Sequence, residues 1–243
     1  MKKTSLFLFL IILISVLIFR ENNFISQESI FSASKTQFLI SNPSWKVIDK
    51  DSNYTFQLTS KVAERKSHDD EFFIIDPLLE MHLDQKLTNS ISSREAILKT
   101  DEHRLTMKSE VHLKLPSRNG FINLYTQLLR IDFKNKVAST EYDTDLTSDL
   151  FSLKGKGFKL EQSIKGEALL TFKEANFQRD NNDGYIEVGK ADTVLLQEKS
   201  DVLILRGSAE IKLKSMKMNA DEIKFNVRTK KIMSSKNSSI KNT

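Results

Sequence analysis

Residues 105–115, LTMKSEVHLKL, decide the fold class of this chain. Apart from Ser109, every second side chain in the stretch is apolar, and the side chains between them are polar or charged. Successive side chains of a β-strand point to opposite faces of a sheet, so this alternation describes a strand with one buried and one solvated face. Residues 54–59 and 203–213 alternate in the same way. The body of the chain, from Trp45 onward, is therefore predicted to be β-sheet.

A pair of strands occurs twice in the sequence. Residues 105–113 align with residues 203–211 position for position, and residues 124–136 align in the same way with residues 218–230. A unit of two strands cannot bury its apolar face alone and must stack on copies of itself. We predict an all-β fold, an open antiparallel β-jellyroll or β-taco of repeated strand pairs.

The alternating apolar side chains have two interpretations. If the folded sheet closes on itself they form an ordinary core, which is the simpler interpretation of the pattern alone. If the sheet stays open along one side they line a trough, where each methylene group of a lipid gains about 0.8 kcal/mol on leaving water. The unpaired strands at the ends of the repeats are either protected or serve as docking sites.

The amino terminus has the features of an export or anchoring segment. Two lysines precede an apolar run, residues 6–19, and Arg20 ends it. The run is close to the roughly 17–25 helical residues that span a bilayer core, and no small-residue cleavage motif follows it closely. We predict an uncleaved transmembrane helix in residues 1–22, with its amino end in the cytoplasm. A signal peptide cleaved near Ser34 is the alternative.

The composition argues against several classes of function. The chain has no Cys, which removes disulfides, thiolate nucleophiles and Cys-ligated metals. Its formal charge of +5 is compatible with an anionic partner, but the export segment disfavours nucleic acid. No two of the four histidines have the helical spacing of a zinc protease, and there is no Gly-x-Ser-x-Gly elbow. We predict no catalytic residues, no metal and no cofactor.

Three weaker chemical motifs were weighed in the same way. Residues 180–184, DNNDG, resemble a calcium loop, but Ala191 stands where the bidentate Glu belongs, so a hairpin turn is predicted. Residues 155–157 lack the third Gly of a dinucleotide fold. Asp143 and Asp145 would have to act as paired carboxylates of a glycan hydrolase, but neighbouring strand positions offer no cleft between them.

Several motifs, in order and spacing, resemble LptC-type proteins, the bitopic periplasmic component of the lipopolysaccharide export bridge. These are NPSW (42–45), YTFQLTSKVA (54–63), IDP (75–77), EA (95–96), LTMKSEVHLKL (105–115), LYT (124–126) and LKGKGFKL (153–160). The resemblance covers roughly residues 42 to 172, and the single amino-terminal anchor fits it. Residues 191–223 resemble instead the repeat of the soluble bridge protein LptA and its OstA-like relatives.

The resemblance implies a division of the chain. The expected parts are the anchor (1–22), a tether (23–41), an LptC-like periplasmic β-domain (42–175), an OstA/LptA-like β-repeat extension (176–233) and a flexible basic tail (234–243). A single-pass inner-membrane protein with its carboxy-terminal domain in the periplasm is implied.

The resemblance also implies a lipid conduit without chemistry of its own. Such proteins receive lipopolysaccharide from the permease subunits of an inner-membrane ABC transporter and pass it to a soluble periplasmic bridge protein of LptA type. The implied groove-lining residues are Phe56, Leu58, Leu105, Met107, Val111, Leu113, Leu124, Ile131, Phe133, Leu203, Leu205 and Ile211. The implied partner-docking edge holds Ile223, Phe225 and Val227. The alternative is an envelope structural or assembly scaffold with a filled β-core and no lipid ligand.

Overall fold

The computed structural model describes residues 36–49, 54–66, 70–83, 86–117, 120–162, 168–180, 186–197, 201–213 and 216–242. Contacts divide the chain after Thr36, and residues 37–243 form one compact unit. Within the described residues all regular elements are β-strands of a single 18-stranded sheet, which confirms the predicted all-β fold. In that part of the chain no helix is long and apolar enough to cross a membrane. The predicted anchor, residues 1–22, lies outside the described residues.

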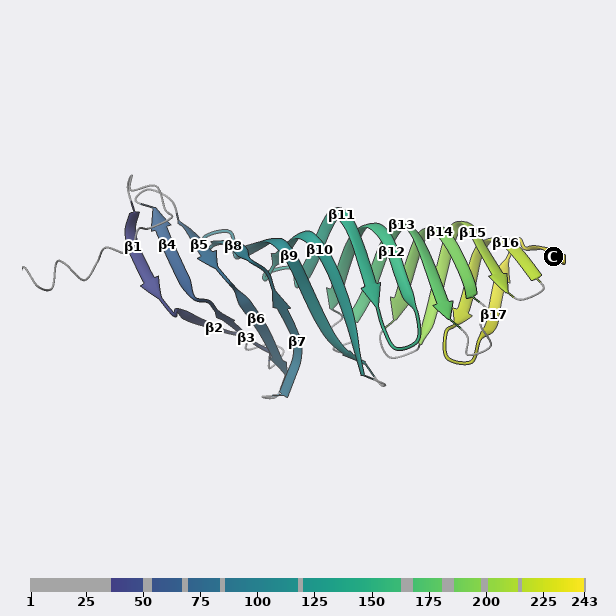
Figure 1. Cartoon of the computed structure of the whole chain (residues 1–243), viewed down its shortest axis with the longest axis horizontal. Coiled ribbons are helices and arrows are strands. Elements are labelled where there is room, and N and C mark those ends of the chain that lie inside the picture. Colours follow the sequence, from purple (N-terminus) through teal and green to yellow (C-terminus); the bar gives the residue numbers. More distant parts are fainter. Residues whose placement is uncertain are drawn as a thin grey trace, which may run out of the picture. The chain divides into compact units, whose positions relative to one another are not determined.

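The strands follow one another along the stack in Figure 1. Their bounds are β1 Thr36–Ser41, β2 Ser44–Asp49, β3 Tyr54–Thr59, β4 Val62–Lys66, β5 Glu71–Ile75, β6 Leu78–Leu83, β7 Lys86–Ser92, β8 Glu95–Lys99, β9 Arg104–Ser117, β10 Gly120–Asp132, β11 Val137–Thr147, β12 Ser152–Gln162, β13 Ala168–Asp180, β14 Ile186–Gln197, β15 Val202–Leu213, β16 Met216–Asn226, β17 Lys231–Lys236 and β18 Ser239–Asn242.

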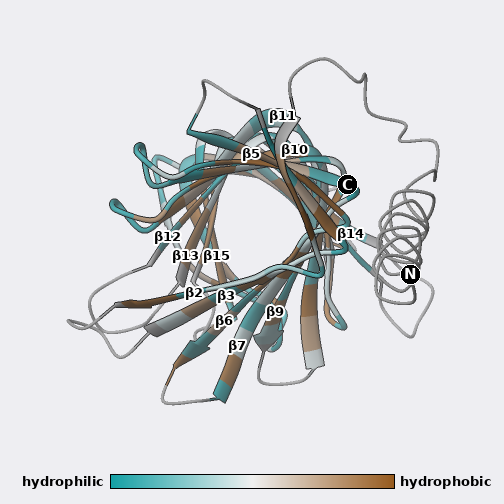
Figure 2. Ribbon diagram, turned by 90° about the vertical axis from the view of Figure 1, so that its left-hand side faces the viewer, coloured by the Kyte–Doolittle hydropathy of each residue, from teal (hydrophilic) through white to brown (hydrophobic). Residues whose placement is uncertain are grey.

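The sheet is folded into two layers. In the first layer β4 pairs with β5, β5 with β8, and β8 with residues 104–108 of β9. In the second layer β2 pairs with β3, β3 with β6, β6 with β7, and β7 with residues 112–114 of β9. The long strands β9 to β16 each pass through both layers and pair antiparallel with their neighbours in sequence. Figure 2 looks along the stack, and the layers enclose the interior.

Left-handed backbone conformations lie where the chain passes from one layer to the other. The residues with positive φ at these corners are Asn42, Asp76, Ser109, Glu110, Gly157, Glu174, Gly207 and Ser208. Backbone hydrogen bonds join neighbouring corners: the Asp76 N–H donates to the Arg94 carbonyl at 2.9 Å, and the Arg94 N–H donates to the Ser109 carbonyl at 3.0 Å. Irregularities of this kind bend a strand sharply while its neighbours stay paired.

The corner in β9 explains why the same alternate side chains of residues 105–115 face the interior in both layers. Ser109 and Glu110 both adopt positive φ. Met107 and Val111, on either side of them, are both fully buried. Since two residues form the corner, the same parity faces inward before and after it. Ser109, the polar residue at an apolar position, therefore marks the bend.

The predicted repeat is present in the structure. β9 and β10 are paired antiparallel, as are β15 and β16. The turn after β10 and the turn after β16 are capped alike: the Asn135 N–H donates to the Asp132 carboxylate at 2.8 Å, and the Thr229 N–H donates to the Asn226 side chain at 2.8 Å. The hydrogen bonds from Asn135 hold the pKa of Asp132 below its usual value.

Three predicted boundaries do not coincide with breaks in the sheet. The boundary at 175/176 falls inside β13, so the predicted extension continues the main domain without interruption. The predicted tether, residues 23–41, ends in β1. The predicted flexible tail, residues 234–243, contains the end of β17 and all of β18, both of which pair with β16. Its short polar strands lack the long apolar alternation by which the others were found.

Candidate functional site

The residues predicted to line a groove face the interior between the two layers. All of them are buried except Phe133, which is partly buried and packs against the others. Leu105, Met107 and Leu113 have 0% of their surface exposed. The interior is therefore filled by its own side chains along these strands. Whether these residues contact lipid stays a prediction.

Aromatic pairs join the two layers at separate places along the stack. The ring centroids are 5.8 Å apart in Trp45–Phe72, 5.5 Å in Phe56–Phe133 and 5.6 Å in Phe177–Phe225. In each pair one residue belongs to the second layer and the other to the first. Such contacts contribute roughly 0.5–1.5 kcal/mol beyond their buried area.

Phe177 depends on a glycine opposite it. Phe177 of β13 and Gly189 of β14 are direct cross-strand partners. A Cβ atom added to Gly189 would lie 1.9 Å from Cε1 of Phe177. The ring therefore lies flat over Gly189, and from there it stacks on Phe225 of the other layer. Gly189 is the position that lets this aromatic pair form.

A small cavity lies between the two layers. It has a volume of about 40 Å³ and lies beside the turn at residues 133–136. Its walls come from both layers: Phe56, Met81, Asn89, Ile91, Ile131, Asp132, Phe133, Lys136, Val137, Ala138 and Leu160. Ligand pockets usually measure about 300–1,000 Å³. The cavity is thus far smaller than a finished binding pocket.

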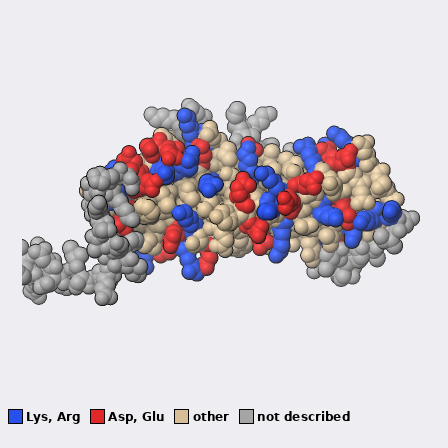
Figure 3. Space-filling view, turned by 90° about the horizontal axis from the view of Figure 1, so that it is seen from above, with Lys and Arg blue, Asp and Glu red and all other residues tan. Residues whose placement is uncertain are grey.

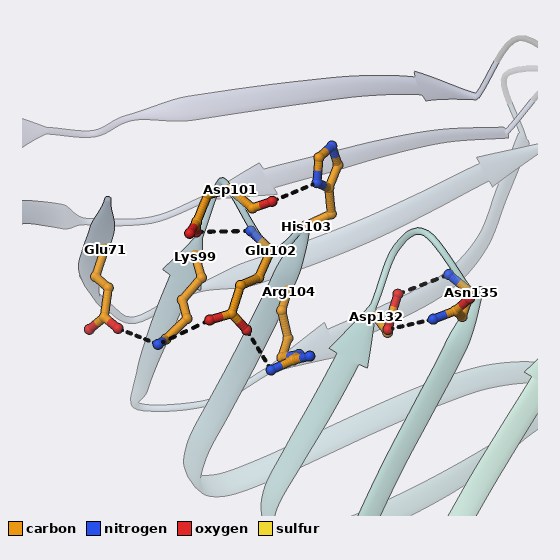
Figure 4. A network of polar contacts seen from close by, with 8 residues as sticks. All are labelled: Glu71, Lys99, Asp101, Glu102, His103, Arg104, Asp132 and Asn135. Atoms are coloured by element: carbon orange, nitrogen blue, oxygen red, sulfur yellow. Dashed lines mark hydrogen bonds and ion pairs between the residues drawn. The ribbon is translucent and has the colours of Figure 1, made fainter. Parts of the chain in front are cut away.

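The charged side chains beside this turn are engaged with one another (Figure 4). Lys99 lies between Glu71 and Glu102, with Nζ–O distances of 2.5 Å and 3.4 Å. Hydrogen bonding to Glu71 and then to Glu102 raises the pKa of Lys99. Arg104 also binds Glu102, at 2.5 Å. These cations are balanced by carboxylates, so this network is an ordinary solvated ion-pair cluster.

Some of the basic residues near the carboxy terminus are paired with carboxylates in the same manner. Lys217 donates to Glu210 at 2.9 Å and Arg206 donates to Glu222 at 2.8 Å. The hydrogen bond from Arg206 lowers the pKa of Glu222. Burial raises the pKa of Glu210, but its lysine neighbours outweigh burial and the net shift is downward. Figure 3 shows positive and negative side chains interspersed over the face in view.

The ends of the sheet carry apolar side chains in solvent. Among the described residues, β2 pairs only with β3, and β17 and β18 pair only with β16. Val47 and Ile48 at one end expose 52% and 61% of their surface, and Met233 and Ile240 at the other expose 61% and 56%. Edges of this kind accept a strand from a partner.

The prediction that Ile223, Phe225 and Val227 form a free edge is wrong. β16, which holds the first two, pairs with β15 on one side and with β17 and β18 on the other. All three side chains are buried in the core. The short strands after them were missed because residues 231–242 are rich in Lys, Ser and Asn and show no sustained alternation. The edge lies one strand further along, and docking there stays a prediction.

No group of three or more potential metal-ligating side chains occurs in the part of the chain that the structure describes. His82, His103 and His112 lie on separate strands or turns, and His112 stacks on Tyr125 with its Nε2 3.0 Å from the Asn123 side chain. Asp143 and Asp145 lie in β11 on the exposed side of the sheet. Residues 181–184 of the predicted hairpin turn lie outside the described residues.

The described residues thus form one antiparallel sheet that is folded about an apolar interior and carries exposed apolar side chains on its end strands. The family model described as lipopolysaccharide-assembly, LptC-related, matches residues 6–166. The chain belongs to this LptC-related family, which confirms the predicted resemblance.

One solved structure that is similar to the chain is LptH of Pseudomonas aeruginosa, described as the LptA-homologous periplasmic component of the conserved lipopolysaccharide transport device. The match has a TM-score of 0.45 and 18% sequence identity, and covers 53% of this chain and 98% of that one. No curated protein matches the chain.

Proposed function

We propose that this chain is the membrane-anchored, periplasm-facing member of a lipopolysaccharide transport bridge. It accepts lipopolysaccharide from the permease subunits of an inner-membrane ABC transporter and passes it to the next β-module, a soluble protein of LptA type. It carries out no chemistry, and the transporter's ATPase supplies the energy. Membership of the LptC-related family supports a role in lipopolysaccharide assembly.

The observation that carries this proposal is the continuity of the interior. Buried apolar side chains extend as one cluster from Phe56 in β3 to Val227 after β16, through every strand between them that spans both layers. Each methylene group transferred into such an interior gains about 0.8 kcal/mol, so a twelve-carbon chain gains on the order of 10 kcal/mol before costs. This is enough to offset the separation of several contacts between the layers.

The anchor belongs to the same proposal. The apolar run at residues 6–19 follows Lys2 and Lys3 and precedes a polar stretch, and the family match begins at residue 6. A single helix there would hold the β-module at the inner membrane with its body in the periplasm.

A scaffold without a lipid ligand is the second candidate. The fully buried side chains of β9 and the small size of the cavity favour it. The two functions differ in one respect: a conduit must open its layers and hold a lipid, whereas a scaffold keeps its core closed.

Native mass spectrometry of the full chain, extracted from inner membranes, tests the proposal. We expect the mass of a chain that retains residues 1–22, together with a population that carries bound lipopolysaccharide. A chain truncated near Ser34 would contradict the anchor, and a lipid-free chain from actively exporting cells would favour the scaffold.

A further inference from the structure

A charged pair lies inside the apolar interior at the end of β13 and the start of β14. Arg179 and Glu187 are direct cross-strand partners and expose only 8% and 6% of their surface. Nη1 of Arg179 lies 3.8 Å from Oε2 of Glu187, an ion pair that is too long for a hydrogen bond. Nη1 of Arg179 is buried and has no hydrogen-bond partner among the described residues.

Both side chains belong to the interior face of the sheet. The neighbouring cross-strand pair, Phe177 and Gly189, lies two residues away on each strand, and residues two apart share a face. Phe177 is fully buried and reaches the opposite layer. Val188, between the two interior positions of β14, is exposed. Arg179 therefore points to the same side as the core phenylalanine.

The pair lies at the margin of the second layer. Arg179 is the last interior side chain described in β13, and Glu187 is the first described in β14. The neighbouring strands bring Phe151 and Leu213 beside the pair, and both are apolar and pack into the core. The guanidinium thus lies where an apolar interior meets the end of its strands.

The pair is a poor device for stability. Removing two charges from water costs several kcal/mol for each ion, and only close contacts with full hydrogen bonding offset that cost. Here the oxygen is 3.8 Å away, and Nη1 of the guanidinium has no hydrogen-bond partner among the described residues. Apolar side chains of similar volume would serve a closed core at least as well. Buried charges are normally fully hydrogen-bonded, and proteins break this rule mostly at functional sites. The incomplete pairing therefore indicates that the charge of Arg179 has a function.

We propose that Arg179 is a subsite for the phosphate group of an amphiphile whose acyl chains occupy the interior. Glu187 takes the place of that phosphate in the ligand-free chain. The inference rests on the proposed function, since it requires chains between the layers. It adds that the interior of β13 and β14 selects an anionic head group, which apolar residues alone cannot do.

The chemistry of the guanidinium favours phosphate. Arg presents parallel N–H donors that match two oxygens of a phosphate, and such charge-assisted bonds are about twice as strong as neutral ones. A phosphate at Nη1 would also accept the hydrogen bond that Oε2 of Glu187, 3.8 Å away, is too distant to accept. Acyl chains beneath it would lie against Phe177 and its neighbours, so head group and chains meet their preferred surroundings together.

Matched amphiphiles test the subsite. The full chain, held in a nonionic amphipol, is titrated by calorimetry with dodecyl phosphate and with dodecyl maltoside, which has the same chain and a neutral head. Because the two amphiphiles share the same chain, the ratio of their dissociation constants measures the contribution of the head group to the affinity. We expect the wild type to prefer dodecyl phosphate and Arg179→Gln to lose about tenfold or more of that preference. Glu187→Gln removes the competing carboxylate, so the preference should increase.

The subsite predicts that Arg179→Gln lowers the preference for dodecyl phosphate and that Glu187→Gln raises it. A purely structural pair predicts no such opposite changes in the two variants. The double variant Arg179→Gln/Glu187→Gln buries no charge, so it stays informative if a single variant fails to fold; it should bind both amphiphiles alike. Lys190→Gln, on the exposed face of β14, is the control and should leave the preference unchanged. A double variant that keeps the wild-type preference overturns the subsite alone. A wild type that binds neither amphiphile overturns the proposed function and the subsite with it.

Discussion

Gly189→Ala is expected to lower the free energy of unfolding by about 3 kcal/mol or more, the upper part of the range for overpacked cores. The added Cβ would lie 1.9 Å from Phe177 Cε1, so the ring must leave its position over β14. The stack of Phe177 on Phe225, which joins the two layers, would be lost with it. Urea denaturation followed by circular dichroism measures the change.

Gly155→Ala is the matched control for this prediction. A Cβ there would meet its nearest atom, Cβ of Phe172, at 3.1 Å, which asks for a shift of only a few tenths of an ångström. We expect a loss below about 1 kcal/mol, as for other tolerated core changes. The double variant Gly189→Ala/Phe177→Leu should recover part of the stability. Equal effects of the two alanine substitutions would refute the role assigned to Gly189.

Proline at both Met233 and Ile240 is expected to abolish docking of the soluble bridge protein. These residues lie in β17 and β18, which form the outer edge after β16. Proline removes backbone donors and distorts an edge strand. With each lost or unsatisfied hydrogen bond costing about 1–3 kcal/mol, affinity should fall about 100-fold or more. Pull-down of the soluble partner by the full chain measures it.

Threonine at the same two positions is the control, because it removes the exposed apolar side chains but keeps every backbone donor. We expect it to retain most of the docking. The edge substitution must not be placed at Phe225: this residue is fully buried, so proline there would unfold the core rather than release a partner. Proline variants that bind the soluble protein as the wild type does would show that docking occurs elsewhere.

The sequence was sufficient to predict which side chains share the buried face of a strand, but not whether the opposing layer closes on that face. Period-two alternation placed Leu105 and Leu113 on one face, and that face is buried. Whether the opposing layer closes on this face depends on long-range contacts such as Phe56–Phe133. The sequence separation of such partners follows no local pattern, so the alternation favours an ordinary core as the simpler interpretation but does not exclude an open trough.

Two of the corners have a local signal in the sequence that the prediction of the strands does not include. Asn42-Pro43 and Asp76-Pro77 stand at corners, where Asn and Asp tolerate the observed positive φ and proline stands immediately before the next strand. The Arg179–Glu187 pair had none. Its register depends on the length of the connection between β13 and β14, and a shift of one residue in β14 would turn Glu187 to the opposite face and leave Arg179 without this partner.

The central claim is that the interior between the layers holds lipid during export. A photo-reactive benzoylphenylalanine at Phe133, an interior aromatic residue beside the cavity, tests it against the same group at Tyr125, which is aromatic and exposed on the outer face. The full chain is assembled with the transporter and lipopolysaccharide, and ATP is added before illumination. The account predicts ATP-dependent capture of lipopolysaccharide at position 133 and little at position 125. Equal capture at the two positions, or none at position 133 while export proceeds, would contradict it.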